Sequence, residues 1–462
     1  MTIWPPNPDD LRRPAYRSLA EALISAVDAG ELRDGDRLPT HRNLAYDLGL
    51  SVQTVSRAYD ELIRRGVIAG EVGRGTFVKS GRSDTQTPFL PDGRYGELID
   101  FSLLKPVFEP MHLNMMRRAL SKLGGDLPAS AVSSFRPSGV LRNYTTSALK
   151  WLKRCGLDVP SQGLLLTNGN TAAMTVALMT AAGTGDLIVT EELGHHTLRP
   201  LSRYIGLRIQ GLEIDDEGVV PSAFARACEK SVVKAIYLMP TGLNPRAATM
   251  SMERRKELVR LARLHDVLII ENDAWGPLQP NRPEPIAALA PERTLYFTSL
   301  TKCIMPGLRY GFLVVPETYQ SAAANRHLVT SWMVTPLMAE IGSRWIEDGT
   351  SEFLLDWQMK ALGERNRKAA AILSSTVFNC SENGMHIWLP MPGSWTEDAF
   401  VAHARLNGVA LAHGSSFELS DSVNKKGVRI CLGAETIETM ERGLTVVSRL
   451  ARSNPEPPLL TL

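Results

Sequence analysis

The sequence predicts a multi-domain protein, in which a small helical domain with a β-hairpin precedes a large α/β domain and a smaller α+β domain. Its 462 residues exceed one ordinary domain, and 44% hydrophobic with 22% charged residues is typical of a globular chain with large cores. Helical spacing dominates residues 16–66, whereas apolar runs of strand length alternate with helical segments after residue 160.

Three helices are predicted near the N-terminal end. The first spans Tyr16 to about Ala29, the second begins after an N-cap at Thr40 and runs through Leu48, and the third spans Ser51 to about Gly66. Two short strand-like runs joined through glycines follow at 67–78. Three helices and a hairpin in this order form a winged helix-turn-helix. The apolar positions expected to face its core are Leu19, Leu23, Ile24, Val27, Val55, Tyr59 (or Ala58) and Leu62.

Local charge makes DNA a candidate partner of this domain. Residues 1–36 carry 4 basic and 7 acidic side chains, whereas residues 37–80 carry 7 and 4. A local positive field is compatible with phosphate contact even in a domain that is neutral overall. Short helix pairs with a glycine turn also occur in proteins that never bind DNA, so spacing alone leaves the function open.

The residue pattern resembles the DNA-binding domain of the GntR family over about Tyr16 to Lys79. The motifs are GELRDGDRLPTHR at 30–42, Leu44-Ala45, VQTVSRAY at 52–59 and GRGTFV at 73–78. The resemblance implies that the polar face of the third helix reads base edges while arginines fix the register on phosphates. The expected recognition residues are Gln53, Thr54, Ser56 and Arg57, and the expected backbone or minor-groove contacts are Arg42 and Arg74.

Residues 80–96 are polar, contain Pro and Gly and show no clear period, so they are expected to be a linker between a domain at 1–79 and the rest. A large domain at 97–335 is predicted from strand runs that alternate with helices, and a smaller α+β domain at 336–462 begins with helices. The expected strands lie at 163–167, 186–190, 234–239, 267–270 and 294–298, and in the smaller domain at 385–389, 408–411 and 427–432.

Other features point to a cytoplasmic protein. No apolar run approaches the length needed to cross a bilayer, and the first ten residues lack the pattern of a secretory signal. The five cysteines are far apart in sequence and show no metal-binding spacing. We therefore expect no membrane association, no disulfide framework and no metal site.

The stretch SLTKCIMPGLRYG at 299–311 is the strongest chemical signal in the chain. A lysine at a strand end can form a Schiff base with an aldehyde when burial or nearby cations lower its pKa. Lys302 alone would more often be a surface lysine. Here Ser299 and Thr301 supply hydroxyl groups and Arg309 a cation for phosphate, so the set suits a phosphorylated aldehyde, with pyridoxal 5′-phosphate as the leading candidate.

Residues 97–462 resemble the fold-type I aminotransferases, whose S-x-[ST]-K-x3-PGxRxG signature this stretch matches. The resemblance implies that Lys302 forms the internal aldimine and that Ser299 and Arg309 bind the phosphate. Amide groups at Asn170 and Thr171, at a helix start, are expected to bind it too. Two further matches are Asn244, expected at the ring hydroxyl, and Arg429, expected to bind an effector carboxylate unless it serves as a structural salt bridge.

Three positions depart from that family. An acid is expected at the pyridine nitrogen, but either Asp273 or Asn272 occupies the place, depending on how the spacing is counted. Trp275 stands where a tyrosine is expected, and an indole cannot accept a hydrogen bond. His195 stands where an aromatic ring stacks on the cofactor. Cofactor binding is therefore expected together with weak or absent transamination, because an asparagine would weaken the electron sink.

The domain order resembles the MocR subfamily of GntR-family transcription regulators. The resemblance implies a homodimer that binds double-stranded operator DNA and responds to pyridoxal phosphate or to a small amino compound through an aldimine at Lys302. Two alternatives stay open at this point. The first is an active aminotransferase with an attached DNA-binding domain, and the second is a regulator whose C-terminal part serves only for dimerisation.

Overall fold

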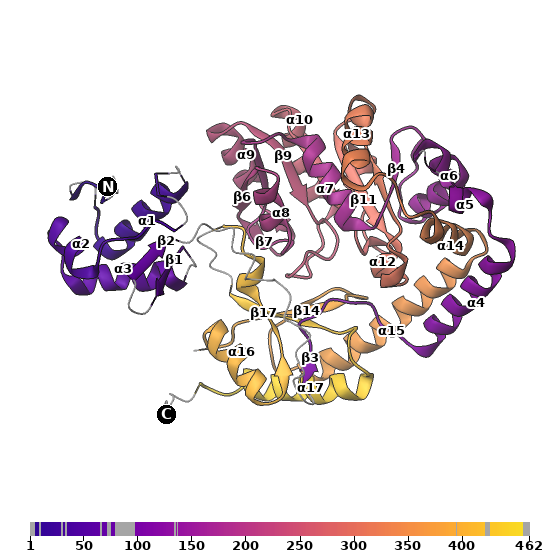
Figure 1. Ribbon diagram of the computed structural model, residues 1–462. Coiled ribbons are helices and arrows are strands. Elements are labelled where there is room, and N and C mark those ends of the chain that lie inside the picture. Colours follow the sequence, from indigo (N-terminus) through magenta and orange to yellow (C-terminus); the bar gives the residue numbers. More distant parts are fainter. Residues whose placement is uncertain are drawn as a thin grey trace. The chain divides into compact units, whose positions relative to one another are not determined.

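The computed structural model describes residues 5–8, 11–28, 31–32, 35–64, 67–71, 75–78, 98–133, 135, 137–393, 395–420 and 426–455. The chain divides into two compact units, Met1–Gly93 and Arg94–Leu462 (Figure 1). No helix in the described part of the chain is both long enough and apolar enough to cross a membrane.

The first unit is a winged helix-turn-helix, as the sequence predicts. Its elements are α1 (Ala15–Asp28), α2 (His41–Asp47), α3 (Val52–Arg64), β1 (Ile68–Glu71) and β2 (Gly75–Val78). Thr40 caps α2 by accepting a hydrogen bond from the backbone N–H of Asn43, which confirms the expected helix start. The two strands pair as an antiparallel hairpin, and Arg37 forms a bridge to Phe77 beside it.

A small apolar core holds the three helices of this unit together. Leu19 and Leu23 from α1 and Val55 from α3 are fully buried, and both Ala58 and Tyr59 face inward. Ile24 and Val27 pack against this core as partly buried residues. The helical spacing in the sequence therefore identified the buried faces correctly.

The second unit is built on a seven-stranded sheet in the order β4-β12-β11-β10-β9-β5-β6 (Figure 1). Neighbouring strands are parallel except β12, which is antiparallel to both β11 and β4. All residues of β5 and β11 are buried, as expected when helices cover both faces of a sheet. The strands are β4 (Leu164–Thr167), β5 (Leu187–Glu191), β6 (Arg208–Leu212), β9 (Val233–Leu238), β10 (Leu268–Asn272), β11 (Thr294–Ser299) and β12 (Gly311–Val314).

Helices surround this sheet, and a second, smaller sheet follows. The helices are α4 (Pro110–Asp126), α5 (Ala129–Ser133), α6 (Pro137–Arg154), α7 (Asn170–Ala181), α8 (Leu198–Tyr204), α9 (Pro221–Lys230), α10 (Met252–Leu264), α11 (Ile286–Leu289), α12 (Leu300–Cys303), α13 (Gln320–Ser331), α14 (Pro336–Glu347), α15 (Thr350–Ile372), α16 (Glu397–Leu406) and α17 (Ile437–Ala451). The smaller sheet has the order β13-β14-β17-β16. Its strands are β13 (Asn379–Cys380), β14 (His386–Pro390), β16 (Ala412–His413) and β17 (Gly427–Cys431), and the remaining short strands are β3 (Ile99–Asp100), β7 (Ile214–Asp215), β8 (Gly218–Val219) and β15 (Val409–Ala410).

The long helix α15 joins two apolar cores (Figure 1). Leu354 and Leu362 belong to the core around the large sheet, whereas Ala369 belongs to the core beneath the smaller sheet. Helix α14, which the sequence groups with the smaller domain, contributes Trp345 to the larger core. Strand β3 lies in the smaller part, because it pairs with β15. The functional residues described below come from both parts.

Candidate functional site

Lys302 lies in the short helix α12, directly after the buried strand β11. Ser299 caps this helix by accepting a hydrogen bond from the backbone N–H of Thr301 at 3.3 Å. The ammonium group of Lys302 donates to the carbonyl oxygen of Leu104 at 2.5 Å. Burial lowers the pKa of Lys302 to about 8, and the cations Arg429 and Arg309 act in the same direction, against the opposing effect of Cys431. Lys302 is therefore a buried amine whose neutral form is populated near neutral pH.

A cradle for an anion lies at the start of α7, and we define it as Gly169, Asn170, Thr301 and Arg309. Gly169 has a φ of +80°, and a methyl group on it would lie 3.3 Å from Oγ1 of Thr301 and 3.4 Å from Cζ of Arg309. Within the described residues, Oγ1 of Thr301 and both amide atoms of Asn170 are buried without a hydrogen-bond partner. Buried polar atoms are normally paired, and a helix N-terminus favours negative charge. The cradle fits a phosphate group.

The two other residues predicted to bind phosphate lie beside the cradle. Thr171 is exposed in the first turn of α7, and its carbonyl oxygen accepts a hydrogen bond from the hydroxyl of Thr175. Ser299 is fully buried, and its hydroxyl oxygen caps α12. The backbone therefore brings both close to the cradle, although the hydroxyl of Ser299 already accepts a bond within its own turn.

Arg429 on β17 has a buried guanidinium group that is only partly paired. Its Nη1 donates to Oδ1 of Asn244 at 3.0 Å, and its Nη2 donates to the carbonyl oxygen of Ser102 at 2.6 Å. The group lies over the ring of Phe417, 4.7 Å from its centroid. Among the described residues, Nε of Arg429 has no acceptor. An unpaired guanidinium N–H in a buried place suits a carboxylate, which accepts two parallel hydrogen bonds from arginine.

Two stacked histidines lie near these cations. The rings of His195 and His196 are 4.9 Å apart between centroids, with an angle of 20° between their planes. Nδ1 of His195 lies 2.8 Å from the hydroxyl of Thr197. Burial lowers the pKa of His195 well below its ordinary value and that of His196 to about 4, and both Lys302 and Arg429 contribute. Both imidazoles are therefore neutral at pH 7.

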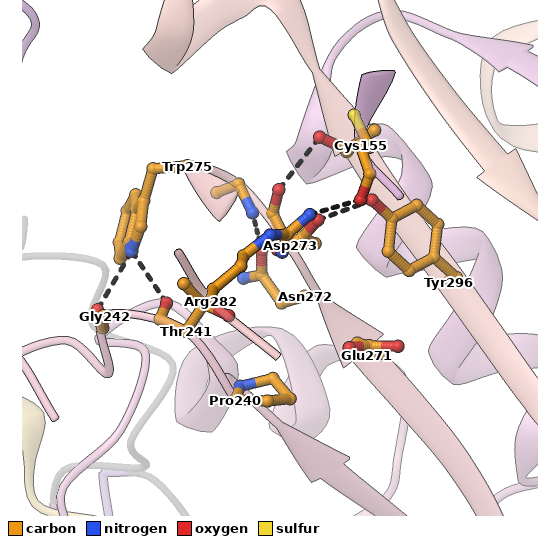
Figure 2. A network of polar contacts seen from close by, with 12 residues as sticks. Cys155, Pro240, Thr241, Gly242, Glu271, Asn272, Asp273, Trp275, Arg282 and Tyr296 are labelled. Atoms are coloured by element: carbon orange, nitrogen blue, oxygen red, sulfur yellow. Dashed lines mark hydrogen bonds and ion pairs between the residues drawn. The ribbon is translucent and has the colours of Figure 1, made fainter. Parts of the chain in front are cut away.

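The neighbours Asn272 and Asp273, at the end of β10, have different partners (Figure 2). Nδ2 of Asn272 donates to the hydroxyl oxygen of Tyr237 at 2.6 Å, and that hydroxyl lies 3.6 Å from the sulfur of Met174 on α7. Asn272 thus belongs to the side of the sheet that carries α7, whose N-terminus forms the cradle. Oδ1 of Asn272 accepts from the backbone N–H of Ala274 at 3.1 Å.

Asp273 lies in a separate buried network (Figure 2). Its carboxylate pairs with Arg282 and accepts a hydrogen bond from the hydroxyl of Tyr296 at 2.5 Å. Arg282 also donates to the carbonyl oxygen of Cys155, and only 7% of its side chain is exposed. Both carboxylate oxygens of Asp273 are therefore engaged within this network.

The indole of Trp275 contacts the loop that follows β9 (Figure 2). Its indole Nε1 donates to the carbonyl oxygens of Thr241 and Gly242, both at 3.0 Å. The chain reaches Asn244 two residues later. Trp275 therefore braces the loop that carries Asn244.

The first unit places most of the predicted DNA-binding residues on or beside α3. Gln53 and Arg57 are exposed, and the guanidinium of Arg57 lies over the ring of Tyr16 at 4.6 Å. The hydroxyl of Thr54 bonds to that of Ser51 at the helix start, and Ser56 bonds to Nδ1 of His41 at 3.1 Å. These two side chains already have partners within the domain. Arg42 is exposed on α2, and Arg74 lies outside the described residues.

Several residues of the site carry little or no sequence signal. In the sequence, Tyr237 looks like an ordinary strand residue and Arg282 looks like a surface cation. Only the fold shows that both side chains are buried. Ser102 and Leu104 contact the site through backbone carbonyl groups, which every residue has, so their side chains give no sign of this role. Asp100 is the one residue here with a usable sequence signal. An aspartate side chain often accepts a hydrogen bond from the backbone N–H two residues ahead, which would have predicted a turn at Ser102.

Comparisons with known proteins agree on both units. Residues 15–78 match the family model of bacterial regulatory proteins of the gntR family, and residues 128–447 match that of aminotransferase class I and II. The HTH-type transcriptional regulator YdeF of Bacillus subtilis, described as uncharacterized, is 26% identical over 97% of this chain and 96% of its own length.

Two relatives have more specific names. The HTH-type transcriptional regulator TauR of Rhodobacter capsulatus is 26% identical over 86% of this chain and 88% of its own length. The vitamin B6 salvage pathway transcriptional repressor PtsJ of Salmonella typhimurium is 26% identical over 89% of this chain and 93% of its own length.

Solved structures support the fold of the second unit. A kynurenine aminotransferase of Pyrococcus horikoshii superposes with a TM-score of 0.70 at 22% identity, covering 78% of this chain and 91% of its own. The α-aminoadipate aminotransferase LysN of Thermus thermophilus superposes with a TM-score of 0.69 at 18% identity, covering 77% and 92%. At these identities the likeness concerns the fold.

Proposed function

Because this chain belongs to the aminotransferase class I and II family and carries a gntR-family regulatory domain ahead of it, we propose that it regulates transcription in response to an amino compound bound with pyridoxal 5′-phosphate. This pairing of domains is the arrangement of the MocR subfamily. One relative is named a repressor of the vitamin B6 salvage pathway, which supports a link between this architecture and the cofactor.

The observation that carries the proposal is the set of buried, unpaired polar atoms around Lys302. Oγ1 of Thr301, the amide of Asn170 and Nε of Arg429 lack partners within the described residues. Leaving such groups unpaired costs about 1–3 kcal/mol each, which a ligand that pairs with them would recover. The first two belong to the cradle, where the hydroxyl of Thr301 and the amide nitrogen of Asn170 are donors that suit a phosphate. The third suits a carboxylate.

Pyridoxal phosphate, when bound, supplies an aldehyde that condenses with primary amines and a ring that withdraws electrons. On this proposal the cradle would hold its phosphate, and Lys302 would supply the amine that binds the aldehyde. Asn244 uses its amide oxygen to accept from Arg429, so its amide nitrogen would be free to donate to the ring oxygen. The imidazole of His195 would lie against the ring face.

We assign the place beside the pyridine nitrogen to Asn272 rather than Asp273. The carboxylate of Asp273 is engaged by Arg282 and Tyr296, whereas Asn272 lies on the side of α7. A neutral amide does not hold a proton on a ring nitrogen as a carboxylate does. The site is therefore expected to bind amines and exchange them, with little turnover. Rapid transamination with a 2-oxo acid would favour an active enzyme instead.

The first unit supplies the DNA contacts of the proposed regulator. Gln53 and Arg57 present exposed polar groups on α3, and Arg42 presents one on α2. We propose that a homodimer places two such units on a repeated operator sequence. Control requires that the effector bind two states of the dimer with different affinity, and a difference of about 1–3 kcal/mol is sufficient.

A trapping experiment tests the proposal. Full-length protein is incubated with pyridoxal phosphate, reduced with borohydride and digested, and the modified peptide is identified by mass spectrometry. Modification at Lys302, lost in Lys302→Ala, is the expected result. The same samples, with and without a panel of amino acids and amines, are tested for shifts of DNA from the upstream intergenic region. Unmodified Lys302 in a cofactor-saturated sample would contradict the proposal and favour a C-terminal unit that serves only for dimerisation.

A further inference from the structure

One short segment contacts two cations of the site, Lys302 and Arg429, through its backbone. The chain leaves β3 at Asp100 and passes through the buried Phe101 to Ser102 and Leu104. The carbonyl oxygen of Ser102 accepts from Nη2 of Arg429 at 2.6 Å, and that of Leu104 accepts from Nζ of Lys302. This segment therefore contacts the amine and the proposed carboxylate-binding group at once.

The carboxylate of Asp100 fixes the shape of that segment. Its Oδ1 accepts from the backbone N–H of Ser102 at 2.7 Å and from the hydroxyl of Ser102 at 2.6 Å. The backbone N–H of Asp100 donates to Oε1 of Glu435 at 3.1 Å, and β3 pairs with β15 through backbone atoms. The strand thus has its own supports, whereas the turn at Ser102 depends on the side chain of Asp100.

The orientation of Arg429 depends in turn on this carbonyl group. A guanidinium is planar, so fixing Nη1 on Asn244 and Nη2 on Ser102 fixes the direction of the unpaired Nε–H. If the Ser102 carbonyl moved, the remaining contacts of Arg429 would leave its plane free to rotate. A carboxylate bound by two parallel hydrogen bonds is sensitive to such rotation.

We propose that Asp100 is a positioning residue that orients Arg429 and thereby sets how strongly the site prefers amino acids over amines without a carboxylate. The inference rests on the proposed function, because it assigns a carboxylate ligand to Arg429. It also places this preference at a strand that closely follows residues 80–96, which the sequence predicts to be a linker.

The test compares L-alanine with ethylamine, which carries the amine but no carboxylate. Both are titrated into full-length protein loaded with pyridoxal phosphate while the absorbance of the cofactor is followed. Asp100→Ala is expected to reduce the preference for L-alanine about tenfold, the factor for losing one hydrogen bond to a charged group. Affinity for ethylamine is expected to stay unchanged.

Two variants serve as controls for Asp100→Ala. Asp100→Asn keeps an oxygen that accepts from Ser102, so it is expected to retain the preference. Asp266→Ala removes a 99%-exposed carboxylate that lies 3.6 Å from Arg293, and it is expected to change neither ligand's affinity. An unchanged preference in Asp100→Ala, or an equal loss for both ligands, would overturn the inference, since the second result shows a general structural effect.

A measurement without cofactor separates this inference from the proposed function. Propionate is added to apo-protein, and the rise in melting temperature is compared among wild type, Asp100→Ala, Asp100→Asn and Arg429→Gln. The rise is expected in wild type and Asp100→Asn, and its loss in the other two. If neither amine changes the cofactor absorbance, the proposed cofactor function fails, and the propionate result alone decides for or against Asp100.

Discussion

Raising the pH from 7 to 9 is expected to accelerate the attachment of pyridoxal phosphate at Lys302 about tenfold, with a plateau above about pH 9. Attachment requires the uncharged amine, and burial lowers the pKa of Lys302 to about 8. The neutral fraction is then about one tenth at pH 7 and about nine tenths at pH 9. For a lysine with the ordinary pKa of about 10.5, the neutral fraction would rise about a hundredfold over the same interval, without a plateau.

The assay measures the initial rate of attachment at constant cofactor concentration, from pH 6.5 to pH 10 in steps of about half a unit. Samples are quenched with borohydride, and the modified fraction of the Lys302 peptide is quantified. Pyridoxal phosphate has ionisable groups of its own. The rate with Nα-acetyl-lysine, measured in the same buffers, is therefore divided out after correction for that amine's own neutral fraction.

The outcome distinguishes a buried amine from a solvated one. A half-maximal rate near pH 8 supports the proposed environment of Lys302. A corrected rate that continues to rise tenfold per pH unit up to pH 10 would refute it, because the ammonium group would then be as well solvated as a surface lysine. Arg429→Gln offers an internal check. Removing one neighbouring cation is expected to move the half-maximal point to higher pH.

Three further predictions concern stability, cofactor affinity and DNA binding. Arg282→Met leaves the buried carboxylate of Asp273 without its cation and is expected to lower the free energy of unfolding by about 3–5 kcal/mol in urea titrations, whereas Arg260→Met, which removes an exposed ion pair, is expected to have a much smaller effect. Gly169→Ala places a methyl group within the anion cradle at a φ of +80° and is expected to weaken pyridoxal phosphate binding at least tenfold in equilibrium dialysis; unchanged affinity would remove the cradle from the proposed site. Arg57→Ala is expected to abolish operator shifts in gel assays while the cofactor absorbance stays unchanged, and an unchanged shift would remove Arg57 from the interface.

The fold was predictable where a single local rule decides the outcome. The cap at Thr40 and the buried face of α3 follow from residue type and helical spacing, and the buried strands β5 and β11 follow from apolar runs. Strands β6 and β12 were not predicted. Two of the five residues of β6 are exposed at the sheet edge, and β12 follows the lysine signature so closely that its short apolar run is obscured.

The sequence predicts which residues belong to the candidate site, but it does not predict the contacts that they make. The family resemblance predicts Lys302, Arg309 and Arg429 for one site, and their roles remain predictions for this chain. The sequence could not decide between Asn272 and Asp273, because adjacent strand residues point to opposite faces and the spacing leaves the register open. The contacts of Asp273 with Arg282 depend on the position of a loop nine residues later, which no local pattern specifies.

If the chain has the proposed function, the contacts of Lys302 and Arg429 explain how one site responds differently to amino acids and to amines. Both cations donate to carbonyl groups of the same segment, at Leu104 and Ser102. An amine that condenses with the cofactor affects only the lysine contact, whereas an amino acid also engages Arg429. The segment from Asp100 to Leu104 would therefore differ in its contacts between a bound amine and a bound amino acid. A difference in contacts between states is what a ligand needs in order to shift their populations. The amino acid changes both contacts, so it has the larger effect on the segment, and an effector with a carboxylate is the one this arrangement favours.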